Sequence, residues 1–211
     1  METLRDILDA VAQGVVLPPD GRVTVVPQMS DRDAGVLAFT AHAVVFIDED
    51  PQWVRDTLAA VSCDALAAPM NPWFLMALLK RTGRRSETID AMLVGAPLPG
   101  EPPLPLTEIT DGDHPRIVYA RGRRDDVRAW TAEGGVLVLG RGVGGRLEVS
   151  VEIDEDVRHR GLGRALAAAA RHLATEPLWA QVAPGNARSM RAFLAAGYRP
   201  VGSEAVLLSA R

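Results

Sequence analysis

The chain has 211 residues, a formal net charge of −4 at pH 7 and 47% hydrophobic residues. This length fits one large domain or two small ones, and the composition is that of a globular protein with an ordinary hydrophobic core. The negative net charge argues against nucleic acid or a membrane surface as a partner. Lys80 is the only lysine among the 23 basic residues, a bias that we attribute to a GC-rich coding sequence.

The sequence indicates neither export nor membrane insertion. Acidic residues interrupt the apolar pattern of the first helix, and no small-residue cleavage site follows, so this segment does not resemble a signal peptide. No apolar run approaches the roughly 20 residues of a membrane span. The single cysteine, Cys63, excludes an internal disulfide and is expected to be buried, and the histidine spacing predicts no metal site. We therefore expect a cytoplasmic protein without a bound metal.

The first half of the chain predicts a mixture of helices and strands. Its helices show apolar residues at helical spacing, and two of them begin where an acceptor side chain precedes a proline. The expected elements are a helix from Leu4 to about Gly14, strands over 22–26 and 35–47, a helix from Asp50-Pro51, a helix over 73–81 after Asn71-Pro72 that stops at Gly83, and a strand over 89–94.

A proline-rich segment divides the two halves. Five prolines fall within residues 96–105, which makes this stretch the best candidate for a linker. Beyond it, turns rich in Gly, Asp and Arg separate short strands, and helices then alternate with strands. The expected elements are strands over 117–120, 127–131, 136–140 and 147–153, a helix over 162–174, a strand over 178–182, a helix over 187–196 and a strand over 205–209.

A glycine turn between a strand and a helix is the most informative feature. Residues 149–164 pass from a strand through an acidic turn into Gly161 and Gly163. Glycine lets a ligand approach the backbone closely, and the first amides of a helix favour an anion. Arg158, Arg160 and Arg164 could add hydrogen bonds to phosphate oxygens. A pyrophosphate would fit this turn, although a tight turn with solvated arginines has the same pattern.

Two segments resemble the GNAT superfamily of N-acetyltransferases. The segment Arg158-His159-Arg160-Gly161-Leu162-Gly163 is similar to the family signature of Arg or Gln, two residues, Gly, one residue, and Gly or Ala. Residues 186–202 resemble the family's second block, in which an Asn follows a strand and a helix ends eleven residues later in Gly and an aromatic residue. Both segments come in the family's order, and the resemblance extends over residues 105–211.

The resemblance implies a fold, a cosubstrate and a set of contacts. The expected fold is α/β (α+β), with a GNAT-type mixed, splayed central sheet flanked by helices over 105–211 and an N-terminal α/β subdomain over 1–100. Acetyl-CoA would bind as cosubstrate between the strand ending at Ile153 and the strand 178–182, for direct attack by a primary amine. Contacts with CoA are implied for Val151, Ile153, Arg158, His159, Arg160, Gly161, Leu162, Gly163, Arg164, Asn186 and Ser189.

Two positions depart from the family pattern and bear on proton transfer. Phe193 stands where many members carry a Tyr as general acid, and Gln181 stands where some members carry a Glu as base. Strand alternation predicts that Glu148, Ser150 and Glu152 project from one side of their strand. We take Glu152 as the candidate catalytic base, acting through water, and a plain surface carboxylate is the alternative.

The sequence leaves several interpretations of the whole chain open. The favoured one is an N-acetyltransferase acting on a small-molecule amine or a protein amine, with the N-terminal subdomain on the acceptor side. Another is a non-catalytic acyl-CoA-binding module whose N-terminal half binds a protein. A third makes the chain one elongated unit that begins with the strand 35–47. Asn186 is expected equally as a helix cap. Acceptor identity, acyl chain length and a homodimer stay open.

Overall fold

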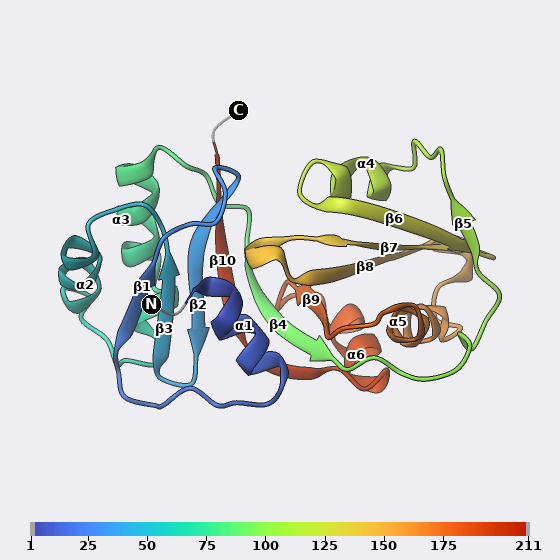
Figure 1. Cartoon of the computed structure of the whole chain (residues 1–211), viewed down its shortest axis with the longest axis horizontal. Coiled ribbons are helices and arrows are strands. Elements are labelled where there is room, and N and C mark those ends of the chain that lie inside the picture. Colours follow the sequence, from blue (N-terminus) through green and yellow to red (C-terminus); the bar gives the residue numbers. More distant parts are fainter. Residues whose placement is uncertain (1–2, 210–211) are drawn as a thin grey trace. The chain divides into compact units, whose positions relative to one another are not determined.

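Figure 1 shows the computed structural model of the chain, which describes residues 3–209. This part of the chain contains six α-helices and ten strands, with both parallel and antiparallel pairs, so the expected mixed α/β class is confirmed. The chain divides into two compact units. The first unit ends at Ala91 and resumes at Val201, and the second unit is Met92–Pro200.

The strands β4 (Ile89–Gly95) and β10 (Arg199–Leu208) each begin in one unit and end in the other. The expected boundary lay in the proline-rich segment instead. That segment is held against its own unit, because the Leu98 amide donates to the Arg171 carbonyl at 2.8 Å and Arg171 Nε donates to the Ala96 carbonyl at 2.7 Å. The division into an N-terminal subdomain over 1–100 and a catalytic domain over 105–211 stays a prediction.

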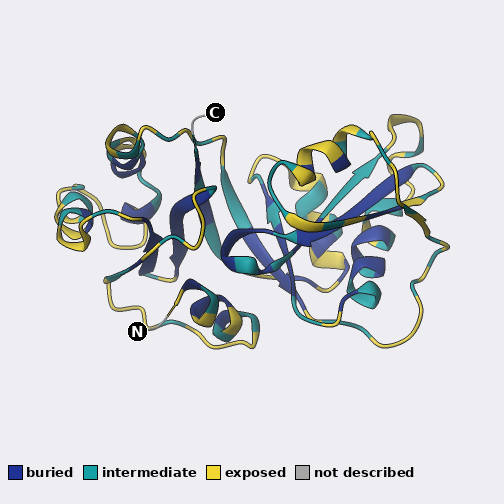
Figure 2. Ribbon diagram, turned by 45° about the horizontal axis from the view of Figure 1, so that its top comes forward, coloured by how far each residue is buried: buried dark blue, intermediate teal, exposed yellow. Residues whose placement is uncertain are grey.

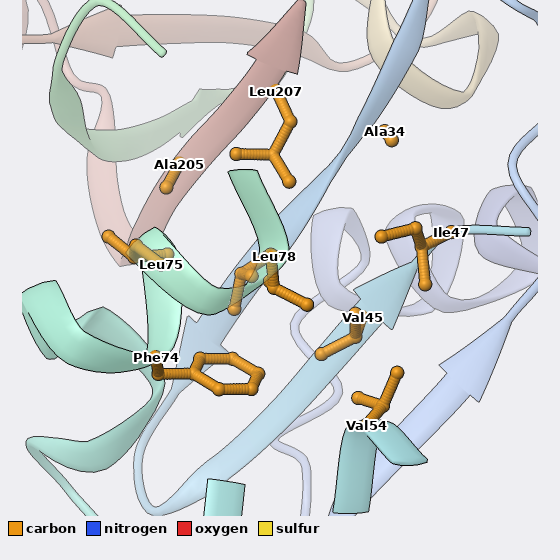
Figure 3. Packing of buried hydrophobic residues seen from close by; sticks show 10 residues of the cluster. Ala34, Val45, Ile47, Val54, Phe74, Leu75, Leu78, Ala205 and Leu207 are labelled. Carbon is orange, nitrogen blue, oxygen red and sulfur yellow. The ribbon is translucent and has the colours of Figure 1, made fainter. Parts of the chain in front are cut away.

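The first unit is a sheet covered by helices. Strand β1 pairs parallel with β3, β3 pairs antiparallel with β2, and β2 pairs antiparallel with β10. On one face, Val54, Phe74 and Leu78 pack against strand residues that include Val45 and Leu207 (Figure 3). The elements are α1 (Leu4–Ala12), β1 (Val23–Val26), β2 (Asp33–Phe39), β3 (His42–Phe46), α2 (Pro51–Ala59) and α3 (Pro72–Thr82).

Local signals fix the helices of this unit as expected. The Asp50 side chain accepts a hydrogen bond from the Gln52 amide at 2.9 Å and so caps α2. Asn71 caps α3 in the same way, and Gly83 ends it in the left-handed region at φ 66°. Each cap replaces a backbone partner that the first turn of a helix lacks.

Two predictions for this unit are wrong. The segment 35–47 is a hairpin of β2 and β3, not one strand, and Phe39 faces His42 across the two-residue turn Thr40–Ala41. Ala41 adopts φ 53°, which usually requires Gly or Asn, so the composition gave no signal for a turn. Cys63 is exposed, because it lies in an irregular segment after α2. The strands β2 and β3 are buried along their whole length (Figure 2).

The second unit carries an antiparallel meander with one parallel strand added. Strands β5 to β8 pair antiparallel in sequence order, and β9 pairs parallel with β8. Helix α5 lies on one face, where Leu166 approaches Gly135, and α4 lies on the other, where Ile117 packs with Val138. The elements are β5 (Thr107–Ile109), α4 (Pro115–Arg121), β6 (Asp125–Ala132), β7 (Gly135–Arg141), β8 (Leu147–Ile153), α5 (Leu162–Leu173), β9 (Leu178–Val182) and α6 (Ala187–Ala195).

The strand predicted over 117–120 is wrong, since these residues lie in helix α4. The β-branched and aromatic side chains of this stretch favoured a strand. The His114 side chain accepts a hydrogen bond from the Arg116 amide at 3.1 Å, and Pro115 takes the first helical position. The cap and the proline therefore outweigh the intrinsic preference.

Candidate functional site

Strands β8 and β9 diverge soon after they meet. Their pairing covers only Leu147 with Leu178 and Glu148 with Trp179, although β8 runs on to Ile153. On its other edge, β8 pairs with β7 along its whole length. The expected splay of the sheet is therefore confirmed, and backbone groups of β8 beyond Glu148 have no strand partner on the β9 side.

The glycine turn lies between the end of β8 and the start of α5. His159 adopts φ 70° and Gly161 adopts φ 84°, so two residues of the turn are left-handed. No side chain caps α5, whose N-cap residue is Gly161. A Cβ added to Gly161 would meet nothing within 4 Å, so open space adjoins the turn. These features together leave the first amides of α5 accessible to an anion.

Gly163, unlike Gly161, has neighbours within van der Waals contact of the place where a Cβ would be. A Cβ at this position would lie 3.8 Å from Ile153 Cγ1 and 3.8 Å from Ala192 Cβ. The first turn of α5 thus lies against the end of β8 and against α6. The uncapped helix start is in this way held beside the strand that diverges from β9.

The arginines of the turn are only partly directed at this open side. Arg158 donates to the Ile153 carbonyl at 3.3 Å and to Glu155 Oε1 at 3.1 Å, so its guanidinium folds back onto the chain. Arg160 donates to the Asp156 carbonyl at 3.4 Å, while Arg164 is exposed on the first turn of α5. Contacts of these three side chains, and of Leu162, with phosphate stay predictions.

Asn186 acts as a helix cap. Its Oδ1 accepts a hydrogen bond from the Ser189 amide at 3.1 Å at the start of α6. Both residues lie at the start of α6, which follows β9, the strand that diverges from β8. Their contact with CoA, implied by the resemblance, stays a prediction.

Neither aromatic residue near the end of α6 can serve as a ready proton donor. Phe193 is buried, and its ring meets that of Tyr198 edge to face with centroids 5.0 Å apart. The Tyr198 hydroxyl donates to the Ala167 carbonyl at 3.1 Å. Burial raises the pKa of Tyr198 well above its usual range, so this phenol keeps its proton.

A buried charge network marks the point where β8 and β9 part. Glu148 accepts hydrogen bonds from Arg124 Nε at 2.9 Å, Arg146 Nε at 2.8 Å and the Val143 amide at 3.2 Å. Burial by itself raises the pKa of Glu148, but the two guanidinium groups outweigh it and hold the pKa below the usual value. Arg146 also lies 5.1 Å from the ring centroid of Trp179. Glu148 is therefore a fixed anion and not a proton acceptor.

Glu148, Ser150 and Glu152 lie on one side of β8, as the alternation predicted. Arg124 Nη1 donates to Ser150 Oγ at 3.2 Å, and Arg116 Nε of α4 donates to Glu152 Oε2 at 2.9 Å. The side chains of Arg116 and Glu152 are 34% and 40% exposed, so this pair is accessible, unlike Glu148 at 7%. Glu152 is thus the accessible carboxylate on this face, and its role as base stays a prediction.

Gln181 contributes an unpaired donor to the same face. Because Trp179 lies directly opposite Glu148, alternation along β9 places Gln181 on the side of Glu148 and Glu152. Its Nε2 is buried and has no hydrogen-bond partner among the described residues. Buried amide groups are nearly always paired, so this nitrogen is suited to an oxygen atom of a ligand.

Sequence reasoning missed Arg116, Arg124 and Arg146, which the structure brings to the carboxylates of β8. It attributed the arginines to coding bias, and no local motif surrounds them. Among residues 3–209, no three His, Cys, Asp or Glu side chains gather as metal ligands. No helix in this range is long and apolar enough to cross a membrane.

The second unit matches a known family. Residues 107–198 match the model of the acetyltransferase (GNAT) family. Solved structures with similarity include a GCN5-related N-acetyltransferase from Kribbella flavida, at 17% identity over 86% of this chain and 90% of that chain, with a TM-score of 0.42. The comparison with curated proteins gave no match.

Two further structures are similar over part of the chain. They are a GCN5-related N-acetyltransferase from Sphaerobacter thermophilus, with a TM-score of 0.38, and a Drosophila protein, with a TM-score of 0.44. Each is 15% identical over 64% of this chain, and this chain spans 56% of the length of each. The family match covers the glycine turn and the diverging strands: over residues 107–198 the chain is similar to the acetyltransferase (GNAT) family.

Proposed function

We propose that this protein is an N-acetyltransferase that uses acetyl-CoA as cosubstrate and acetylates a primary amine. The observation that carries the proposal is the uncapped start of α5 at Gly161, which lies beside the end of β8 where β8 has left β9. An open helix start favours the pyrophosphate, and the unpaired edge of β8 offers backbone groups to the rest of the cosubstrate.

The residues of the turn fit such a ligand. Gly161 has open space where a Cβ would be, so a bulky anion can approach its backbone. In this proposal the amides at Gly161, Leu162 and Gly163 hold the phosphates, His159 shapes the turn, and Arg160 and Arg164 add charge. Arg158 would have to leave Glu155 to contribute, since it is bonded there.

The chemistry requires a polarised carbonyl, a neutral amine and a protonated leaving group. Acetyl-CoA supplies, when bound, a thioester whose carbonyl carbon exchanges its bond to sulfur for a bond to the amine nitrogen, giving the acetylated amine and a thiol. Backbone N–H groups between Val151 and Ile153 would stabilise negative charge on the carbonyl oxygen. Glu152, directly or through water, would accept the proton that the amine loses.

No side chain needs to act as a dedicated acid. Phe193 has no proton to give, and Tyr198 is bonded to a carbonyl with its pKa raised by burial. An ordinary thiol has a pKa of about 8.5, so a thiolate is a fair leaving group that can take its proton from water. This is how the chain can catalyse transfer although it departs from the family pattern.

The experiment compares two glycine variants by calorimetric titration with CoA. Gly161→Val places a branched side chain in the open space at the turn and should abolish measurable binding. Gly100→Val is the matched control, because Gly100 has φ 83°, also meets nothing within 4 Å, and lies in a loop of the same unit. Equal loss of binding in both variants, or no binding by the folded parent protein at millimolar CoA, would contradict the proposal.

A second measurement separates an enzyme from a binding module. Thiol release from acetyl-CoA should depend on added amine, and it should rise with pH as the amine loses its proton. Tight CoA binding without thiol release for any amine would favour the non-catalytic alternative. A cytoplasmic location, a homodimer and an acceptor-side role for the first unit stay predictions.

A further inference from the structure

We propose that the acceptor is an amine that carries its own carboxylate, an α-amino acid or a close analogue. In this proposal Glu152 receives the amino group and Arg116 receives the carboxylate. The inference rests on the proposed function, because it names the substrate class of the same site.

The Arg116–Glu152 pair has the geometry of a receptor for such a molecule. Its contact joins Arg116 Nε and Glu152 Oε2 at 2.9 Å, and both side chains are about one third exposed or more. The guanidinium fork has two further nitrogen atoms that can donate to a second carboxylate, and Glu152 has a second oxygen that can accept from an amine. An α-amino acid presents the complementary groups, a carboxylate and an amine, on one carbon atom.

The pair is held in place by the protein. The His114 side chain caps α4 through the Arg116 amide, and Ile117, one residue on, is buried against Val136 and Val138. Glu152 of β8 lies directly opposite Val136 of β7. Because both partners extend from packed elements, their positions are set before a ligand arrives, which lowers the entropy lost on binding.

The surrounding charge favours a carboxylate and disfavours a polycation. On this side of β8, Arg116 pairs with Glu152, and Arg124 and Arg146 both pair with Glu148. A diamine would bring a second positive charge to a face that carries three guanidinium groups. The unpaired Nε2 of Gln181, on the same side of the sheet, is a further donor that suits a carboxylate or carbonyl oxygen.

The experiment measures thiol release for α-amino acids and for their amides. Each amide keeps the amine and the side chain but replaces the carboxylate by a neutral group. Rates are measured near pH 9 and expressed per concentration of neutral amine, since the amides titrate at lower pH. We expect kcat/KM for the best amino acid to exceed that for its amide by about 10- to 100-fold, the range for a lost charge-assisted hydrogen bond.

A variant of Arg116 tests the assigned residue. Arg116→Gln should lower the ratio of kcat/KM for the amino acid to kcat/KM for its amide by about 10-fold or more, a selective effect that a purely structural role would not produce. Arg121→Gln, on the same helix, is the control and should keep the preference, because Arg121 is exposed and donates to the Gly112 carbonyl. Circular dichroism checks that both variants fold.

The outcomes distinguish this inference from the function on which it rests. Equal or faster turnover of amides, diamines or peptide amines would overturn the amino-acid inference and leave the transferase proposal intact. An amino-acid preference that survives in Arg116→Gln would overturn the assignment to Arg116. Absence of thiol release with every amine would overturn both proposals.

Discussion

Glu148→Gln tests whether the buried charge network holds the second unit together. The substitution keeps the shape of the side chain but removes its negative charge, so Arg124 and Arg146 lose their common partner. The side chains of these three residues are only 7%, 11% and 1% exposed, which means that water cannot replace the lost interactions. The new amide group would also place two N–H donors next to groups that are donors themselves.

The expected loss of stability is large. Breaking one partner of a buried ion pair costs about 3–5 kcal/mol, because an uncompensated charge stays behind. A whole domain is stable by only about 5–15 kcal/mol. With a urea m-value of about 2 kcal/mol/M, a loss of about 4 kcal/mol would lower the urea midpoint by about 2 M.

Urea unfolding followed by tryptophan fluorescence measures this loss, and Trp179 beside Arg146 reports on the site itself. Glu108→Gln is the matched control, because Glu108 also accepts from an arginine, Arg128, but both side chains are exposed. Exposed pairs contribute about 0–1 kcal/mol, so the control should barely shift the midpoint. The reasoning fails if Glu148→Gln costs less than about 1 kcal/mol, or if both variants cost the same.

Three further predictions concern Glu148, Phe193 and Arg84. The folded-state pKa of Glu148 lies below its ordinary value of 4.5, so its contribution to stability is present above pH 4.5 and is lost as the pH falls through the folded-state pKa. As the pH is lowered below 4.5, the urea midpoint of Glu148→Gln should fall less steeply than that of the parent protein. Phe193→Tyr should change the rate of thiol release by less than about 3-fold, and a large gain in turnover would show that an acid was missing. It should lower the free energy of unfolding, measured by thermal unfolding, by about 1–3 kcal/mol because the new hydroxyl is buried beside Tyr198. Arg84→Lys should lower the free energy of unfolding by about 2 kcal/mol and Tm by about 4–8 °C. The reason is that the Arg84 guanidinium donates hydrogen bonds to the Gln28 side chain and to the backbone carbonyls of Asp31, Arg32 and Leu207. An unchanged Tm would show that water replaces these bonds.

Elements with a local cause could be predicted from the sequence. Asp50 and Asn71 bond to amides two residues away, so their helix starts depend on neighbouring residues alone. The glycine turn belongs to the same class, because the left-handed Gly161 and the uncapped helix behind it lie within a few positions. His114-Pro115 carried the same signal as the other two caps, and giving it more weight than strand composition would have predicted α4.

Other elements depended on contacts that no local pattern encodes. The turn at Thr40–Ala41 places Ala41 at a positive φ, and the pairing of β2 with β3 stabilises a conformation that Ala alone disfavours. The strand β10 begins at Arg199, six residues before the expected start, because its neighbours in the sheet and not its own composition set its length.

The sequence by itself determined that Glu148, Ser150 and Glu152 share one side of a strand, because alternation is a property of the extended backbone. It could not determine which of them is available for chemistry. Arg124 lies 24 positions from Glu148, and Arg116 lies 36 positions from Glu152, so only the folded chain brings these charges together. Tertiary structure buries Glu148 between two guanidinium groups and leaves Glu152 accessible beside one, and burial with charged neighbours decides what a carboxylate can do.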